Sequence, residues 1–114
     1  MQQMFYDCSG LTSLDLTSLD TRNVMGMSGM FQGCKSLINL DLSSLNTQKV
    51  TSMNSMFLDC DSLSTLSIGE KFAFVGTYYN LPSDTWYSSN GTAYISNGNS
   101  CTIPSNKADT YTRK

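Results

Sequence analysis

The sequence predicts an α/β solenoid, in which a short stack of repeats is closed by a small β-rich module at the C-terminal end. Three observations predict this fold: an internal repeat at a constant interval, two hydrophobic periodicities inside each repeat, and a change of residue types after residue 75. The 114 residues have the length of one small domain. Hydrophobic residues make up 39% of the chain and recur at regular intervals, which excludes a disordered protein.

The repeat is defined by three segments that begin near Met4, Met30 and Met56. Each segment starts with Met-Phe, and the two intervals between these methionines are equal. Further columns keep this register; they are Cys8, Cys34 and Cys60, then Leu11, Leu37 and Leu63, then Leu14, Leu40 and Leu66. A unit of this length cannot bury its apolar side chains alone, so we expect stacked units to supply the core.

The first half of each unit predicts a β-strand. Residues 37–42 read Leu-Ile-Asn-Leu-Asp-Leu. Because side chains alternate between the two faces of a strand, Leu40 and Leu42 are expected to face the core. Asn39 and Asp41 would then face solvent. Equivalent strands of stacked units would pair in parallel, about 4.8 Å apart.

The second half of each unit predicts a short helix. The apolar residues from Val50 to Cys60 are spaced at i, i+3, i+6, i+7 and i+10, which places them on one face of a helix. Gly33 is expected to end the preceding helix in a left-handed conformation, and Asp59 takes the same role one unit later. One parallel strand and one short helix per unit is the plan of a leucine-rich repeat.

Residues 1–75 are therefore assigned to the repeats and residues 76–114 to a capping β-hairpin module. Phe72 and Phe74 are expected to cover the open end of the stack, as capping segments do. Residues 85–96 hold Asn-Gly between two segments rich in Thr and aromatic residues, which predicts a hairpin with a type I′ turn. The next Asn-Gly predicts a turn into a third strand of a small antiparallel meander, at Cys101, Thr102 and Ile103.

The composition excludes several functions. The net charge is −2 and the seven Lys and Arg residues are scattered, so the chain has no basic stripe for nucleic acid. No apolar run approaches the ~20 residues that span a bilayer. The chain has no histidine, which removes Ser-His-Asp and Cys-His catalysis and zinc binding by imidazole. We therefore expect no enzyme activity, no metal and no cofactor.

Residues 30–55 carry a motif that consists of Met30-Phe31, Cys34, Leu40-Asp41-Leu42-Ser43, Thr47, Val50 and Met53. This motif resembles the repeat of the BspA-like leucine-rich-repeat surface proteins, also called mycoplasma-type lipoprotein repeats. Residues 4–29 follow it nearly as well. One departure is Met25, where Thr is usual, and another is the Leu at 19 and at 45, where Phe is common. The Leu-Pro at residues 81–82, Trp86 and the Gly-Thr-Ala-Tyr at residues 91–94 are similar to a segment that closes such arrays.

The resemblance implies an extracellular bacterial cell-surface protein that mediates adhesion. Its partners would be surface or matrix proteins of a host or of a neighbouring cell, and glycans are the alternative. Met1 already lies in the repeat phase, so the chain is interpreted as part of a longer protein. Any membrane attachment would then depend on an anchor outside this chain. The family shares no residue-level binding site, so none is transferred to these residues.

The exposed strand face is the predicted binding surface, because repeat proteins present such sheets for recognition. Its residues follow a period of two along the strands; they are Ser13, Asp15, Thr17, Asn39, Asp41, Ser43, Thr65 and Ser67. A merely solvated polar face is the alternative. Asp15 and Asp41 also suggest a glycosidase pair or a weak calcium site, although a flat ladder offers no pocket for such chemistry.

Three further patterns allow two interpretations each. Trp86, Tyr87 and Tyr94 form either an aromatic platform for a sugar or protein, or cross-strand pairs within the hairpin. The cysteine column is interpreted as buried thiols rather than a metal or redox centre, because cysteines a whole repeat unit apart match no zinc motif. Residues 90–92 fit a glycosylation sequon, but a turn explains the same residues.

Overall fold

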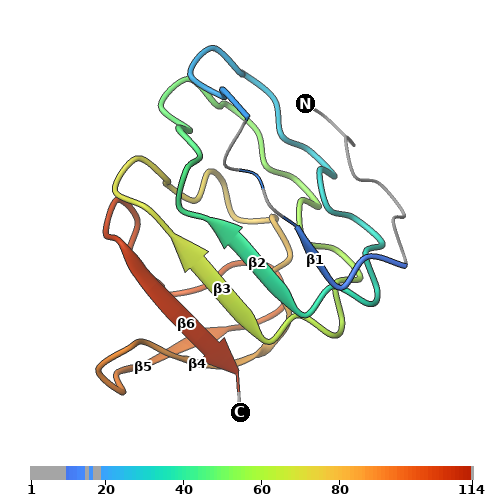
Figure 1. Cartoon of the computed structure of the whole chain (residues 1–114), viewed down its shortest axis with the longest axis vertical. Helices are drawn as coiled ribbons and strands as arrows, with labels where there is room; N and C mark the ends of the chain where they lie inside the picture. Colours follow the sequence, from blue (N-terminus) through green and yellow to red (C-terminus); the bar gives the residue numbers. More distant parts are fainter. Residues whose placement is uncertain (1–9, 15, 17–18, 114) are drawn as a thin grey trace.

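The computed structural model describes residues 10–14, 16 and 19–113. The strands in this part are β1 (Ser13–Leu14), β2 (Asn39–Leu42), β3 (Thr65–Ile68), β4 (Asp84–Tyr87), β5 (Ala93–Ser96) and β6 (Asp109–Arg113). They form one six-stranded mixed sheet in the order β1-β2-β3-β6-β4-β5 (Figure 1). Strands β1, β2 and β3 are parallel, whereas the pairs β3–β6, β6–β4 and β4–β5 are antiparallel.

The parallel strands pair in the register of the sequence repeat. Ser13 pairs with Asn39, and Asn39 pairs with Thr65, so each step across the sheet corresponds to one repeat unit. The leucine column of the repeat lies in the next row, on the buried face. A shift of one residue would bring these leucines to the solvent side, which is why the hydrophobic pattern specifies this register.

The prediction of an α/β solenoid is wrong. The described residues contain no helix, and their strands belong to one compact sheet in which three parallel strands continue into three antiparallel ones. A solenoid would instead repeat one strand and one helix from end to end. A leucine-rich-repeat assignment, which rests on the same alternation, is therefore not supported for this chain.

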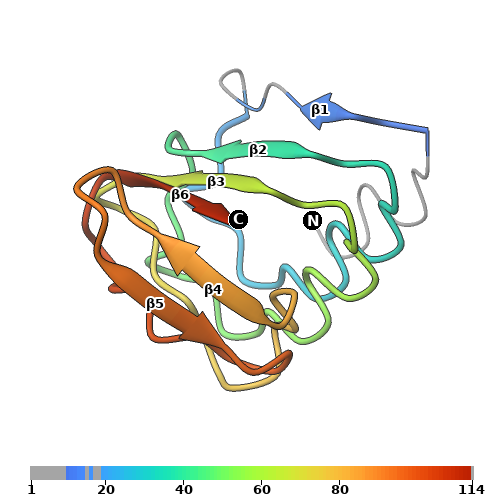
Figure 2. The same ribbon diagram turned by 90° about the horizontal axis from the view of Figure 1, so that it is seen from below.

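The segment predicted as a helix, residues 50–60, forms a series of tight turns. One amide bonds back within the unit, as from Met56 N to Met53 O at 3.0 Å, and the next donates to the neighbouring segment, as from Phe57 N to Tyr79 O at 2.9 Å. In the preceding unit the amides of Met27, Gly29, Phe31 and Gly33 donate to the carbonyls of Ser52, Asn54, Met56 and Leu58. We call these backbone hydrogen bonds between the turn segments of neighbouring units the turn ladder. It runs along the side away from the parallel strands (Figure 2).

Left-handed residues explain why turns replace the helix. The φ angle is positive at Gly29 (64°), Gly33 (80°), Ser55 (61°) and Asp59 (62°). A right-handed helix cannot continue through such a residue. The left-handed conformation expected at Gly33 and Asp59 is present, but it belongs to a turn. Because the turns are short, the helix-like spacing of apolar residues still buries one side of the segment.

Ser55 provides a test of this backbone. It occupies the position of Gly29 in the previous unit, yet a side chain at a φ of 61° is unfavourable. Ser55→Gly should raise the free energy of unfolding by about 1 kcal/mol, since the left-handed cost exceeds the entropy that glycine loses. Urea unfolding measures the change. The control Ser62→Gly, at an exposed residue without positive φ, should lower stability instead; the same sign for both variants would contradict the prediction.

One hydrophobic core lies between the parallel strands and the turn ladder. Its fully buried members include two sets at equivalent repeat positions; they are Met27, Met30, Phe31, Cys34 and Leu37, then Met53, Met56, Phe57, Cys60 and Leu63. The rings of Phe31 and Phe57 stack with centroids 6.0 Å apart. Phe72 is buried beside half-buried Phe74, whose ring stacks on Tyr79 at 4.7 Å. Phe72 and Phe74 therefore extend the core where the repeat pattern ends.

Cys60 makes the stability of this core sensitive to alkaline pH. Burial raises the pKa of its thiol from the ordinary 9.0 to about 12, and its Sγ donates to the Phe31 carbonyl at 3.0 Å. Since the unfolded chain loses this proton first, the free energy of unfolding should fall as the pH rises from 9.0 toward about 12. Cys60→Ala should lose less stability over this range than the parent chain in urea unfolding. Equal losses would exclude Cys60 as a source.

Residues 84–96 form the predicted hairpin, with β4 paired to β5 along its length. Its turn differs from the predicted type I′, because only Gly91 has a positive φ (85°) and Asn90 does not. Ser88 N donates to Thr92 O at 2.9 Å, and Gly91 N donates to Ser88 O at 3.0 Å. These bonds describe a type I turn followed by a left-handed glycine, which is a common hairpin connection.

The expected C-terminal meander is present only in part: the chain turns after β5 and pairs back with it, but residues 101–103 form no full strand. The segment from Cys101 to Ile103 makes one isolated bridge, between Ser96 and Cys101. β6 instead lies between β3 and β4 (Figure 1). The assignment of residues 76–114 to a separate capping module stays a prediction, and β6 shares one sheet with the repeat strands.

Candidate binding surface

The outer face of the sheet carries five of the predicted strand-face residues in two rows, and Ser43 follows directly after β2. In β2, Asn39 and Asp41 are exposed whereas Leu40 and Leu42 are buried, as the period of two predicts. The first row crosses all six strands through Ser13, Asn39, Thr65, Thr112, Tyr87 and Ala93. The second row crosses β2, β3 and β6 through Asp41, Ser67 and Thr110. Directly paired residues project to the same face, so we call this set the outer-face rows.

The second row is connected by hydrogen bonds. The hydroxyls of Ser67 and Thr110 lie 2.9 Å apart. Asp41 Oδ1 accepts the backbone N–H of Ser43 at 2.9 Å, which orders the chain as it leaves β2. Asp41 is the one charged side chain in the outer-face rows of the described residues. Asp15 and Thr17, which were also predicted for this surface, lie outside the described residues.

Thr110 and Thr112 belong to the surface but were not predicted. β6 lies outside the repeat, and it pairs with a strand far back in the sequence, as from Thr110 to Ser67. No local pattern specifies such a long-range antiparallel pair. The one signal is the alternation at residues 110–112, where two exposed threonines flank the buried Tyr111. That alternation is typical of a strand with one solvated face.

The three aromatic residues of the predicted platform do not share one surface. Trp86 is fully buried and pairs with half-buried Tyr94 on the inner face of the hairpin. Tyr87 is paired with Ala93 and projects to the opposite, outer face. The guanidinium of Arg113 lies over the Trp86 ring at 5.6 Å. Trp86 and Tyr94 are therefore core residues here, and only Tyr87 joins the outer-face rows.

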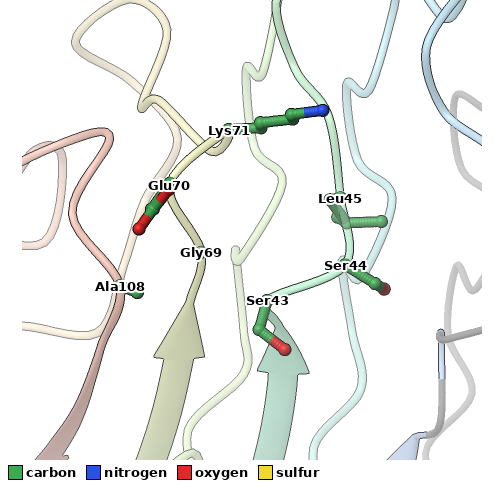
Figure 3. A pocket seen from close by; sticks show the side chains of 7 residues that line it. All are labelled: Ser43, Ser44, Leu45, Gly69, Glu70, Lys71 and Ala108. Carbon is green, nitrogen blue, oxygen red and sulfur yellow. The ribbon is translucent and has the colours of Figure 1, made fainter.

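A shallow depression of about 320 Å³ adjoins the rows where β2 and β3 end. It is lined by Ser43, Ser44, Leu45, Gly69, Glu70, Lys71 and Ala108 (Figure 3). Gly69 lines it where the chain after β3 passes directly against the Ser43 backbone. The Glu70 side chain extends toward Ala108, whereas Lys71 extends toward the segment of Leu45. Ser43 thus joins the polar rows to a concave rim with one anionic and one cationic side chain.

The chemistry of this surface is that of hydrogen bonding. Hydroxyl, amide and carboxylate groups stand side by side at strand spacing, and they can donate to or accept from a partner's polar groups. In the part of the chain that the structure describes, no three His, Cys, Asp or Glu side chains gather in a metal-binding group. That part also holds no helix that is long and apolar enough to cross a membrane.

Comparison with known proteins gives a match to a family model. The model described as "Mycoplasma protein of unknown function, DUF285" matches residues 1–92. No curated protein and no solved structure matches the chain.

Proposed function

This chain belongs to the DUF285 family, and from that premise we propose that it is a non-catalytic module that binds other proteins through its outer-face rows. One observation carries the proposal: hydroxyl and amide side chains from strands far apart in sequence align in register into one continuous polar face. Proteins recognise such faces by matching hydrogen bonds and shape rather than by deep pockets. The resemblance to BspA-like surface proteins extends the proposal to adhesion at a bacterial cell surface.

The size of the face sets the expected strength of binding. Five strands about 13 Å long and the shorter β1, spaced about 4.8 Å apart, make a face of roughly 340 Å². A standard protein interface buries about 800 Å² on each side. A single outer face should therefore bind weakly, with the neighbouring rim of Ser43, Glu70 and Lys71 adding contacts. Adhesion through many weak modules would depend on avidity.

The test is binding of the purified chain to panels of matrix proteins and glycans. Thr112→Arg places a bulky charge in the middle of the first row, and Asp41→Arg does so in the second. Each variant should weaken protein binding at least about tenfold, which corresponds to about 1.4 kcal/mol. Dissociation constants measured by biolayer interferometry give the comparison, and circular dichroism establishes that each variant is folded.

Asp20→Arg is the matched control, because Asp20 is an exposed residue outside the rows whose ion pair is with exposed Arg22. It makes the same change of net charge as Asp41→Arg and should leave binding unchanged. Equal losses in all three variants would locate binding elsewhere. Glycan binding that is lost in Tyr87→Ala, without any protein binding, would replace the proposal with carbohydrate recognition.

A further inference from the structure

β6 is the last strand in sequence, yet it has an interior place in the sheet. Four of its residues pair with β3 and two pair with β4. Figure 1 shows β6 between these neighbours, with the chain entering it from the loop at residues 104–108. Without β6, both neighbours would present open strand edges, and such edges are templates for another strand.

The contacts of β6 define what this position accepts. Tyr111 is fully buried, and its ring meets the ring of Tyr94 edge-on at 5.7 Å. Arg113 donates from Nη2 to the Asp61 carbonyl at 2.7 Å, and its guanidinium covers Trp86 at 5.6 Å. The position therefore selects an antiparallel strand that carries a buried aromatic residue and, two residues later, an arginine.

β6 is held imperfectly in this position. The Tyr111 hydroxyl is buried and has no hydrogen-bond partner among the described residues, which costs free energy relative to a solvated hydroxyl. Toward β4, backbone pairing covers only Arg113 and Thr112. The loop that leads into the strand is exposed from residue 105 to residue 108. It is attached to the segment after β3, where Asn106 donates to the Phe72 and Glu70 carbonyls and Ser105 Oγ accepts from Phe74 N. The unpaired Tyr111 hydroxyl and the short pairing with β4 favour release of the C-terminal strand before other strands separate.

We propose that β6 is exchangeable, and that the position between β3 and β4 accepts the β6 strand of a second copy of this chain. Each half of the resulting dimer would contain every contact of the monomer, because the exchanged strand has the same sequence. The two forms would differ mainly in the loop at residues 104–108. A dimer of this kind places two outer faces on one particle.

Cysteine pairs across β3 and β6 detect the exchange. Ser67 and Thr110 are directly paired, and their hydroxyls lie 2.9 Å apart. Paired residues have Cα atoms about 4.5–5.5 Å apart, within the range of a disulfide. One chain carries Ser67→Cys, a second chain carries Thr110→Cys, and the two are refolded together and mildly oxidised. A disulfide between the two chains requires that β6 of one lies beside β3 of the other.

The expected result is a disulfide-linked dimer of the two chains, identified by mass spectrometry of the linked peptides. The control mixes a Thr51→Cys chain with a Thr110→Cys chain. Thr51 is exposed but lies outside β3. The yield of linked dimer in this mixture therefore measures random linkage and the reaction of native thiols. A Ser67→Cys/Thr110→Cys double variant shows that the geometry allows closure within one chain. Closure in the double variant together with no linkage above control in the mixture would overturn the proposal.

A second variant tests the loop. Deletion of residues 105–107 shortens the reach of the loop by about 10 Å, so β6 should no longer return to its own sheet. This variant is expected to be a dimer at twice the 12.5 kDa chain mass in light scattering. A variant with three added Gly or Ser residues should be a monomer. A folded monomer from the shortened chain would also overturn strand exchange.

Discussion

Gly69→Ala should destabilise the protein far more than the same addition of a methyl group at Gly10. A Cβ on Gly69 would lie 3.0 Å from the carbonyl carbon of Ser43 and closer still to its oxygen. Both atoms belong to the backbone, so no side-chain rotation relieves the overlap. Overpacking of this kind costs typically about 1–3 kcal/mol and occasionally more. We expect a loss of about 3 kcal/mol or more in the free energy of unfolding, because β2 and β3 must separate to admit the methyl group.

Gly10→Ala is the matched control for Gly69→Ala. A Cβ on Gly10 would meet no atom within 4 Å, so this change should alter stability by less than about 1 kcal/mol. Urea unfolding followed by tryptophan fluorescence compares the two variants. Similar midpoints would show that the close approach between Gly69 and Ser43 relaxes easily.

Trp86→Ala is expected to have the largest effect of any substitution in the C-terminal half. Trp86 is fully buried, and its Nε1 donates to the Pro82 carbonyl at 3.3 Å. Truncation of a buried tryptophan costs about 3–5 kcal/mol. The Arg113 guanidinium would also lose the ring that it covers. The variant should unfold at a much lower urea concentration, which circular dichroism can follow without the tryptophan signal.

Tyr87→Ala is the matched control for Trp86→Ala, because it truncates the next residue on the opposite face of the same strand. Tyr87 is only half-buried, so its loss should cost about 1–2 kcal/mol. Comparison of the two variants therefore distinguishes a loss of core packing from a loss of partner binding. If binding is lost in Trp86→Ala but kept in Tyr87→Ala, the loss would reflect unfolding. A stable Trp86→Ala protein would show that the hairpin does not depend on this core contact.

The local patterns of the sequence predicted some parts of the fold well. The leucines at 40 and 42 alternate with Asn39 and Asp41, and this alternation determined both the strand and its exposed face. The hairpin at residues 84–96 followed from turn chemistry and flanking aromatic residues. Both depend on neighbours in sequence, where side-chain periodicity and φ preferences act directly.

The helix prediction failed because one spacing fits two structures. Apolar residues three and four apart suit a helix, but they also suit consecutive short turns. The deciding feature was a positive φ at Ser55 and at Asp59, and neither residue type requires that conformation. Gly29 and Gly33, at the same positions one unit earlier, were the only sequence signal for it.

The place of β6 could not be predicted for a different reason. Its partners lie in β3 and β4, and the choice between these edges depends on how the whole sheet closes. The aromatic contacts that fix the position of β6, such as that between Tyr111 and Tyr94, form only once β6 has joined the sheet. The second row of the candidate surface was therefore incomplete without Thr110, although Asp41 and Ser67 were correctly placed on one face.

Because of the turn ladder, the repeat units should tolerate substitutions on the outer face better than inserted residues. Successive amides from Gly29 to Gly33 alternate between bonding to the next unit and bonding inside their own unit. A single inserted residue would exchange these two roles for every later amide in the segment, while the strands opposite kept their register. Substitutions on the outer face disturb neither set of bonds. Units of this design can therefore diversify the side chains that they display while their length stays constant.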